Sequence, residues 1–194
     1  MLIGITGGIG AGKSVVSRIL RLKGYPVYDC DLRARELMDN SSEIKSALCD
    51  RLGAAALKPD GSIDRSFIAS KVFASDDDRL WLNRLVHGAV REDLGLWTDR
   101  QEGDLCFVES AIMVSSGLDK MCDTIWLVDA PVEIRMRRAV ARGGATAENI
   151  ALRIEAQKGE FELLPEGKTV KILNADNGSL LRQIDLKLES FMLS

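Results

Sequence analysis

The sequence has 194 residues, of which 46% are hydrophobic and 28% are charged, and this length fits one domain with insertions. The net charge of -3 argues against a surface for nucleic acids or anionic membranes, because such surfaces need basic stripes. No apolar stretch approaches the length of a membrane span, and the N-terminus lacks the layout of a signal peptide. We therefore expect a cytoplasmic protein that binds neither nucleic acids nor membranes.

Short apolar runs alternate with longer helical patterns along the chain. Runs of consecutive apolar residues are typical of strands that are buried on both faces of a parallel sheet. Such strands are predicted at Met1 to Thr6, Tyr25 to Asp29, Leu105 to Val108, Thr124 to Asp129 and Thr169 to Leu173.

Helices are predicted between these strands. The first helix covers Lys13 to Lys23 and ends at Gly24, a second begins at Pro131, and the last runs from about Leu180 to Met192 after Asn177-Gly178-Ser179. This order predicts an α/β fold with a doubly wound parallel sheet of about five strands.

More than seventy residues separate the second strand from the third, and their pattern is almost wholly helical, including the amphipathic stretch Asp78 to Trp97. This segment is too long for a plain crossover. We expect one domain over residues 1–194, with a helical substrate lobe at about 32–103 and a lid at about 138–160.

The four cysteines, Cys30, Cys49, Cys106 and Cys122, lie far apart and form no C-x-x-C pair. Cys30 and Cys106 fall in segments that are predicted to be buried strands. We expect reduced core thiols, not zinc ligands or disulfides.

Residues 7–14, GGIGAGKS, fit the pattern G-x-x-x-x-G-K-[ST] between a buried strand and a helix, which is the context of a P-loop. Glycines let consecutive backbone N–H groups converge on phosphate oxygens, and the helix N-terminus adds positive potential. Lys13 is expected to reach the outer phosphates, and Ser14 to offer its hydroxyl to Mg²⁺.

Two acidic positions stand where predicted strands end, the edge at which open α/β sheets bind ligands. Asp29 and Asp31 are two apart, so on an extended segment they point to one side. Asp31 either caps a helix beginning at Leu32 or accepts the proton of an acceptor hydroxyl. Glu109 ends the third strand, where it either faces solvent or holds the substrate or the water shell of the magnesium.

Arg135, Arg138 and Arg142 are spaced three and four apart, so they would lie along one face of a helix. No acid stands three or four residues from any of them. The stripe is either a solvated face or a lid that meets an anion. Gly143-Gly144 would then supply a hinge, and Thr146 can cap the next helix.

The pattern T-G-G-I-G-x-G-K-S, followed by D-x-D-x-x-A-R-E-L, resembles the dephospho-CoA kinase family, which has a P-loop core similar to that of the nucleoside monophosphate kinases. Further matches include Leu85-Val86-His87, the segments that begin at Glu109 and Ser116, the pair Arg138 and Arg142, Arg153-Ile154 with Gln157, and Ile172-Leu173-Asn174. The resemblance covers nearly the whole chain.

This resemblance implies phosphorylation of the ribose 3′-hydroxyl of dephospho-CoA, with ATP as phosphate donor and Mg²⁺ as cofactor. It implies that Asp31, Lys13 and Arg142 are catalytic, that Asp31, Glu109 and His87 bind the substrate, and that Ser14 binds the metal. The nucleotide would be bound by Gly8, Ile9, Gly10, Ala11, Gly12, Lys13, Ser14, Val15, Arg138 and Asn174.

Three positions depart from the family pattern. Gly88 follows the histidine where proline is usual, which predicts a looser turn, and Gly143 replaces an Asp or Asn, which predicts a more mobile hinge. Ser115 stands where the family has a second acid, so no role is assigned to it.

Two other functions are compatible with the P-loop. One is a P-loop kinase for another small hydroxyl or phosphate acceptor. The other is a nucleotide-gated switch, although a GTPase switch would carry an N-K-x-D motif after a late strand and none is present.

Overall fold

The computed structural model describes residues 1–175 and 178–192, and Asn177, which was predicted to open the turn before the last helix, lies outside them. The chain divides into two compact units, Met1–Tyr28 with Gln101–Ser194 and Asp29–Arg100. Among the described residues, no helix combines the length and the apolar character that crossing a membrane would require.

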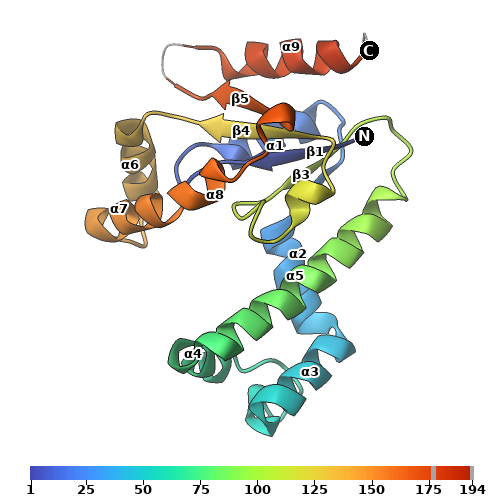
Figure 1. Cartoon of the computed structure of the whole chain (residues 1–194), viewed down its shortest axis with the longest axis vertical. Coiled ribbons are helices and arrows are strands. Elements are labelled where there is room, and N and C mark those ends of the chain that lie inside the picture. The colour runs from blue at the N-terminus through green and yellow to red at the C-terminus, as the bar shows by residue number, and fades with distance from the viewer. Residues whose placement is uncertain (176–177, 193–194) are drawn as a thin grey trace. The chain divides into compact units, whose positions relative to one another are not determined.

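The first unit is built on a five-stranded sheet in the order β2-β3-β1-β4-β5 (Figure 1). β1 pairs in parallel with β3 and β4, and β4 pairs in parallel with β5. The predicted α/β fold with a parallel sheet is confirmed. The strands are β1 (Leu2–Thr6), β2 (Val27–Asp29), β3 (Cys106–Glu109), β4 (Thr124–Asp129) and β5 (Thr169–Leu173).

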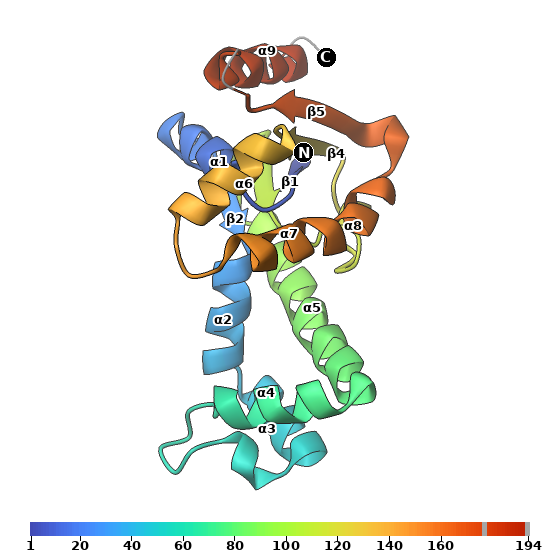
Figure 2. The ribbon, with the colours of Figure 1, turned by 90° about the vertical axis from the view of Figure 1, so that its left-hand side faces the viewer.

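Helices follow the strands of this unit as the pattern predicted. The last strand is followed by α9, which lies beside β5 in both views (Figures 1 and 2). Their bounds are α1 (Lys13–Leu22), η2 (Leu118–Lys120), α6 (Val132–Ala141), α7 (Ala147–Ala156), α8 (Lys158–Glu162), η3 (Glu166–Lys168) and α9 (Leu180–Met192).

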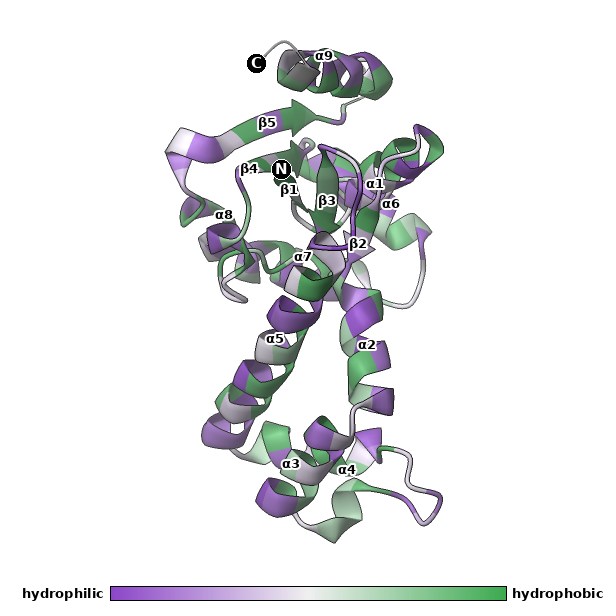
Figure 3. Ribbon diagram, turned by 90° about the vertical axis from the view of Figure 1, so that its right-hand side faces the viewer, coloured by the Kyte–Doolittle hydropathy of each residue, from purple (hydrophilic) through white to green (hydrophobic). Residues whose placement is uncertain are grey.

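The core of this unit joins the central strands to α1 and α9. The strands contribute fully buried side chains such as Ile3, Phe107 and Trp126, and the helices contribute Leu20 and Ile184. The rings of Phe107 and Trp126 lie 5.4 Å apart between centroids. The hydropathy colouring shows β1 and β3 in green (Figure 3), as expected for strands buried on both faces.

The second unit consists of helices, as expected for the insertion. It contains α2 (Cys30–Asn40), α3 (Ser42–Leu52), η1 (Ala54–Ala56), α4 (Arg65–Ala74) and α5 (Asp76–Thr98). α2 packs against α5, where Arg33 forms a salt bridge of 2.7 Å with Asp93. Ile44, Leu48 and Ile68 are the centre of a separate apolar cluster.

Two local predictions in and near this unit were wrong, and a third is confirmed only in part. Cys30 and Asp31 do not extend the second strand, because α2 begins at Cys30. Gly88 stands inside the continuous helix α5 and not in a turn. All four cysteines are free thiols, as predicted, but Cys49 on α3 is only half-buried.

Candidate active site

The loop between β1 and α1 has the backbone that a P-loop needs. Gly10 and Gly12 have φ values of 77° and 103°, in the left-handed region that favours glycine. A Cβ atom on Gly10 would lie 2.2 Å from the carbonyl oxygen of Arg135, and one on Gly12 would lie 2.1 Å from Nδ2 of Asn174. These two positions therefore require glycine for space as well as for conformation.

Three side chains from distant segments hold this loop. The Ile9 N–H donates to Oε1 of Gln157 at 2.8 Å, and Nε of Arg135 donates to the Ile9 carbonyl oxygen at 3.1 Å. Nδ2 of Asn174 donates to the Ala11 carbonyl oxygen at 2.8 Å. The loop is thus fixed from α6, from the α7–α8 junction and from the end of β5.

Lys13 is the first residue of α1, and its Nζ donates to the Gly7 carbonyl oxygen at 2.6 Å. The ammonium group is therefore folded back over the loop that it follows. Ser14 and Val15 are exposed in the same first turn. A positive group and a free helix N-terminus at one place favour an anionic ligand.

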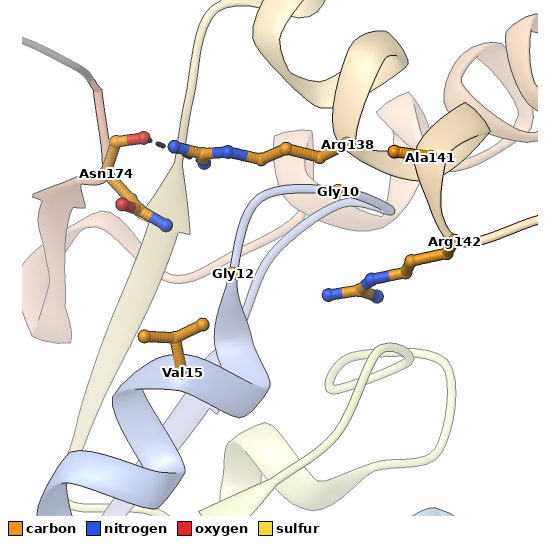
Figure 4. A pocket seen from close by; sticks show the side chains of 7 residues that line it. All are labelled: Gly10, Gly12, Val15, Arg138, Ala141, Arg142 and Asn174. Atoms are coloured by element: carbon orange, nitrogen blue, oxygen red, sulfur yellow. Dashed lines mark hydrogen bonds between the residues drawn. The ribbon is translucent and has the colours of Figure 1, made fainter.

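A pocket of about 390 Å³ opens beside the loop and is lined by Gly10, Gly12, Val15, Arg138, Ala141, Arg142 and Asn174. Figure 4 shows the side chains of Arg138 and Arg142 extending from the end of α6 on one side, with Val15 and Asn174 opposite. Nη1 of Arg138 donates to the carbonyl oxygen of Asn174 at 3.0 Å. The structure thus brings together the loop, Arg138, Arg142 and Asn174.

The three arginines of the predicted stripe have different surroundings. Arg135 is buried against the loop, Arg138 contacts Asn174, and Arg142 is exposed at the C-cap of α6. They do not form one solvated face. α6 turns back into α7 (Figure 2). Thr146 caps α7 as predicted, because its hydroxyl accepts from the Asn149 N–H at 3.3 Å.

Asp31 is exposed in the first turn of α2, in the second unit. It does not cap the helix, because Asp29 holds the N-cap position and its carboxylate accepts from the Leu32 N–H at 3.0 Å. The capping alternative for Asp31 is therefore wrong, and its catalytic role stays a prediction.

His87 is half-buried on α5 of the second unit, and Glu109 is half-buried at the carboxyl end of β3 in the first. Backbone N–H groups of the segment after β3 are held by α8. The Glu160 carboxylate accepts from the Val114 N–H at 2.5 Å and from the Ser115 N–H at 3.3 Å. The Ser115 position is thus tied to an acid from another element.

In this parallel sheet, a glycine-rich loop that ends in Lys-Ser connects a strand to a helix, and arginines lie at a neighbouring pocket. This combination is typical of a P-loop kinase. Residues 1–179 match the family model of dephospho-CoA kinase. The chain therefore belongs to the dephospho-CoA kinase family, and its activity is the phosphorylation of dephospho-CoA, the final step of CoA biosynthesis.

Individual relatives and solved structures are similar to this chain over most of its length. A dephospho-CoA kinase from Porphyromonas gingivalis is 44% identical over 182 residues, which cover 94% of this chain and 90% of that protein. A crystal structure from Thermus thermophilus aligns with a TM-score of 0.76 at 33% identity, covering 100% of this chain and 96% of the other. A dephospho-CoA kinase from Campylobacter jejuni shares the fold, with a TM-score of 0.68 at 22% identity and coverage of 98% and 96%.

Proposed function

We propose that this chain transfers the γ-phosphate of ATP to the ribose 3′-hydroxyl of dephospho-CoA, with the phosphates of ATP on the loop of residues 8–15. The observation that carries this assignment is the pocket beside the loop, into which Arg138 and Arg142 extend. ATP as donor follows from the kinase family. We expect the protein to act in the cytoplasm.

The nucleotide side of the reaction is assigned to the first unit. The loop and Lys13 hold the β- and γ-phosphates, and the pocket takes the nucleoside between Val15 and Arg138. Arg138 suits this role because its guanidinium is fixed on the carbonyl oxygen of Asn174. Arg142 stays exposed at the pocket, and it supplies positive charge during transfer.

The oxygen ligands that are available at this site suit Mg²⁺. Among residues 1–175 and 178–192 there is no cluster of three or more His, Cys, Asp or Glu side chains that could hold a metal alone. Mg²⁺ in kinases needs few protein ligands, because phosphate oxygens and water complete its octahedron. The exposed hydroxyl of Ser14 suits one position, and the bound ion would neutralise phosphate charge.

The acceptor side is assigned to Asp31, with Glu109 and His87 as substrate contacts. The Asp31 carboxylate accepts the proton of the 3′-hydroxyl while the hydroxyl oxygen forms a bond to the γ-phosphorus. The bond from that phosphorus to the bridging oxygen breaks, and ADP leaves. The lobe at about 32–103 would hold the acceptor, and the segment at about 138–160 would close over the phosphates.

The test incubates the protein with Mg²⁺ and ATP against dephospho-CoA, adenosine, AMP, shikimate or buffer alone, and identifies products by mass and by the position of the new phosphate. We expect CoA from dephospho-CoA and poor turnover of adenosine and AMP, because binding energy from the pantetheine arm aligns the hydroxyl. Fast transfer to another acceptor would support a different P-loop kinase. ATP hydrolysis at a rate that no acceptor changes would support a nucleotide-gated switch.

A further inference from the structure

Arg135 on α6 is the one charged residue among the buried side chains that the structure describes. Only 8% of its surface is exposed, whereas Arg137 on the same helix is exposed. Arginine remains ionised in proteins, so its burial places a full positive charge inside the first unit. Charged side chains are rarely buried without a partner, and this placement therefore calls for a reason.

The guanidinium of Arg135 lies directly against the phosphate-binding loop. Its Nε donates to the Ile9 carbonyl oxygen at 3.1 Å, and a Cβ atom on Gly8 would lie only 1.9 Å from its Nη2. Its own carbonyl oxygen approaches Gly10 in the same way. One residue thus contacts three consecutive positions of the loop, Gly8, Ile9 and Gly10.

Among the described residues, no acidic side chain forms a salt bridge with this guanidinium. Nη2 is buried and has no hydrogen-bond partner in that part of the chain. A buried cation without an acid destabilises the nucleotide-free fold. A polyphosphate bound on the loop would provide the missing negative charge, and the low dielectric would strengthen that attraction.

We propose that Arg135 is a positioning residue for the nucleotide, which fixes the loop through Ile9 and raises the positive potential at the loop for the phosphates of ATP. The inference rests on the proposed placement of those phosphates on the loop. Arg135 acts through the loop and does not touch the substrate. Its unpaired charge lowers the stability of the free protein and raises its affinity for polyphosphates.

Two variants separate the charge from the hydrogen bond. Arg135→Gln can still donate to the Ile9 carbonyl oxygen but is neutral, and Arg135→Lys keeps the charge. Arg137→Gln is the matched control, because it removes the same charge from an exposed position on the same helix. For each purified protein we would measure the dissociation constants of ADP and ATP by calorimetry, the thermal midpoint without nucleotide, and kcat and KM for ATP.

We expect Arg135→Gln to bind ATP about tenfold more weakly, to lose more affinity for ATP than for ADP, and to raise KM more than it lowers kcat. Its thermal midpoint without nucleotide should not fall, Arg135→Lys should recover most of the affinity, and the Arg137→Gln control should bind like wild type.

Wild-type affinity in Arg135→Gln would overturn the proposal. Equal losses of affinity in the Gln and Lys variants with lowered thermal midpoints would also overturn it, since the side chain of Arg135 would then serve only to pack the fold. Lys13→Ala is measured alongside. Unchanged ATP affinity in that variant would contradict the placement of the phosphates on the loop itself, which is a separate failure.

Discussion

Asp29 and Asp31 have different structural roles because α2 begins between them, at Cys30. Their spacing suggested a shared side of a strand, but the start of the helix separates them. Asp29 accepts the Leu32 N–H as the cap, and Asp31 is left exposed in the first turn. The spacing alone could not distinguish these roles, because Asp is favoured both in caps and at strand ends.

Substitution of Asp29 should affect stability, whereas substitution of Asp31 should affect catalysis. Asp29→Ala removes the cap and should lower the free energy of unfolding by about 1 kcal/mol, measured by urea denaturation. Asp31→Asn should leave that free energy and ATP binding unchanged but nearly abolish transfer, because an amide cannot accept the proton. An Asp31→Asn protein that retains wild-type turnover would remove Asp31 from the mechanism.

Lys13 is placed to affect turnover more than folding. Its Nζ donates to the Gly7 carbonyl oxygen of the loop, and it stands at the start of α1 where phosphates are expected. Lys13→Ala should lower kcat about a hundredfold or more, with a thermal midpoint close to wild type. Steady-state kinetics on the purified variant would check this, and near-normal turnover would contradict it.

Cys122 is protected by its surroundings. Burial raises the pKa of its thiol to about 12, so at pH 8 almost none of the reactive thiolate forms. We expect iodoacetamide at pH 8 to label the half-buried Cys49 well before Cys122, as followed by mass spectrometry. All four cysteines should react in urea, which is the control. Comparable labelling rates for Cys49 and Cys122 in the native protein would contradict the assignment.

The same pKa has a consequence for stability. The folded protein favours the protonated thiol, and an unfolded cysteine titrates near the ordinary value of 9. The stabilisation from this group is therefore fully present below pH 9 and is lost as the pH rises towards 12.

At the scale of elements, the pattern of the sequence predicted those parts that local chemistry controls. β4, β5 and α9 have the predicted bounds, because apolar runs and the Ser179 cap mark them, with the Ser179 hydroxyl accepting from the Arg182 N–H. The contacts that hold the loop could not be predicted in this way. Arg135 and Gln157 meet Ile9 across 126 and 148 residues, and no local pattern encodes such contacts.

Alanine substitutions at Gly88 and at Gly143 should change the free energy of unfolding in opposite directions. A Cβ atom at either position would meet no atom within 4 Å, but Gly88 is inside α5 and Gly143 has a φ of 74°. Gly88→Ala should raise the free energy of unfolding by about 0.5–1 kcal/mol through helix propensity. Gly143→Ala should lower it by about 1 kcal/mol, because a Cβ atom disfavours that conformation. Urea denaturation of both variants checks the signs, and a stabilising Gly143→Ala would contradict the argument.

At the scale of the whole molecule, the two units differ in how their residues are connected and buried. The first unit is discontinuous in sequence, and its central strand β1 pairs with β3 and β4, whose residues are more than a hundred positions away. The second unit is continuous, and apart from the packing of α2 on α5 its helices pack on neighbours in sequence. The sequence predicted the long helical insertion, but the strand order depends on long-range pairing that apolar runs do not specify.

The difference in burial predicts different stabilities within one chain. The cluster around the central strands of the first unit contains twelve buried residues, and the cluster around Leu48 in the second unit contains five. Local opening is easier where less apolar surface is buried. We expect native-state hydrogen exchange to be slowest for amides of β1 and β4, and faster by at least tenfold for those of α3 and α4. Exchange followed by mass spectrometry across increasing urea would show helices of the second unit opening first. If amides of both units exchanged at the same rate at every urea concentration, the chain would unfold as one cooperative unit, and the prediction would be wrong.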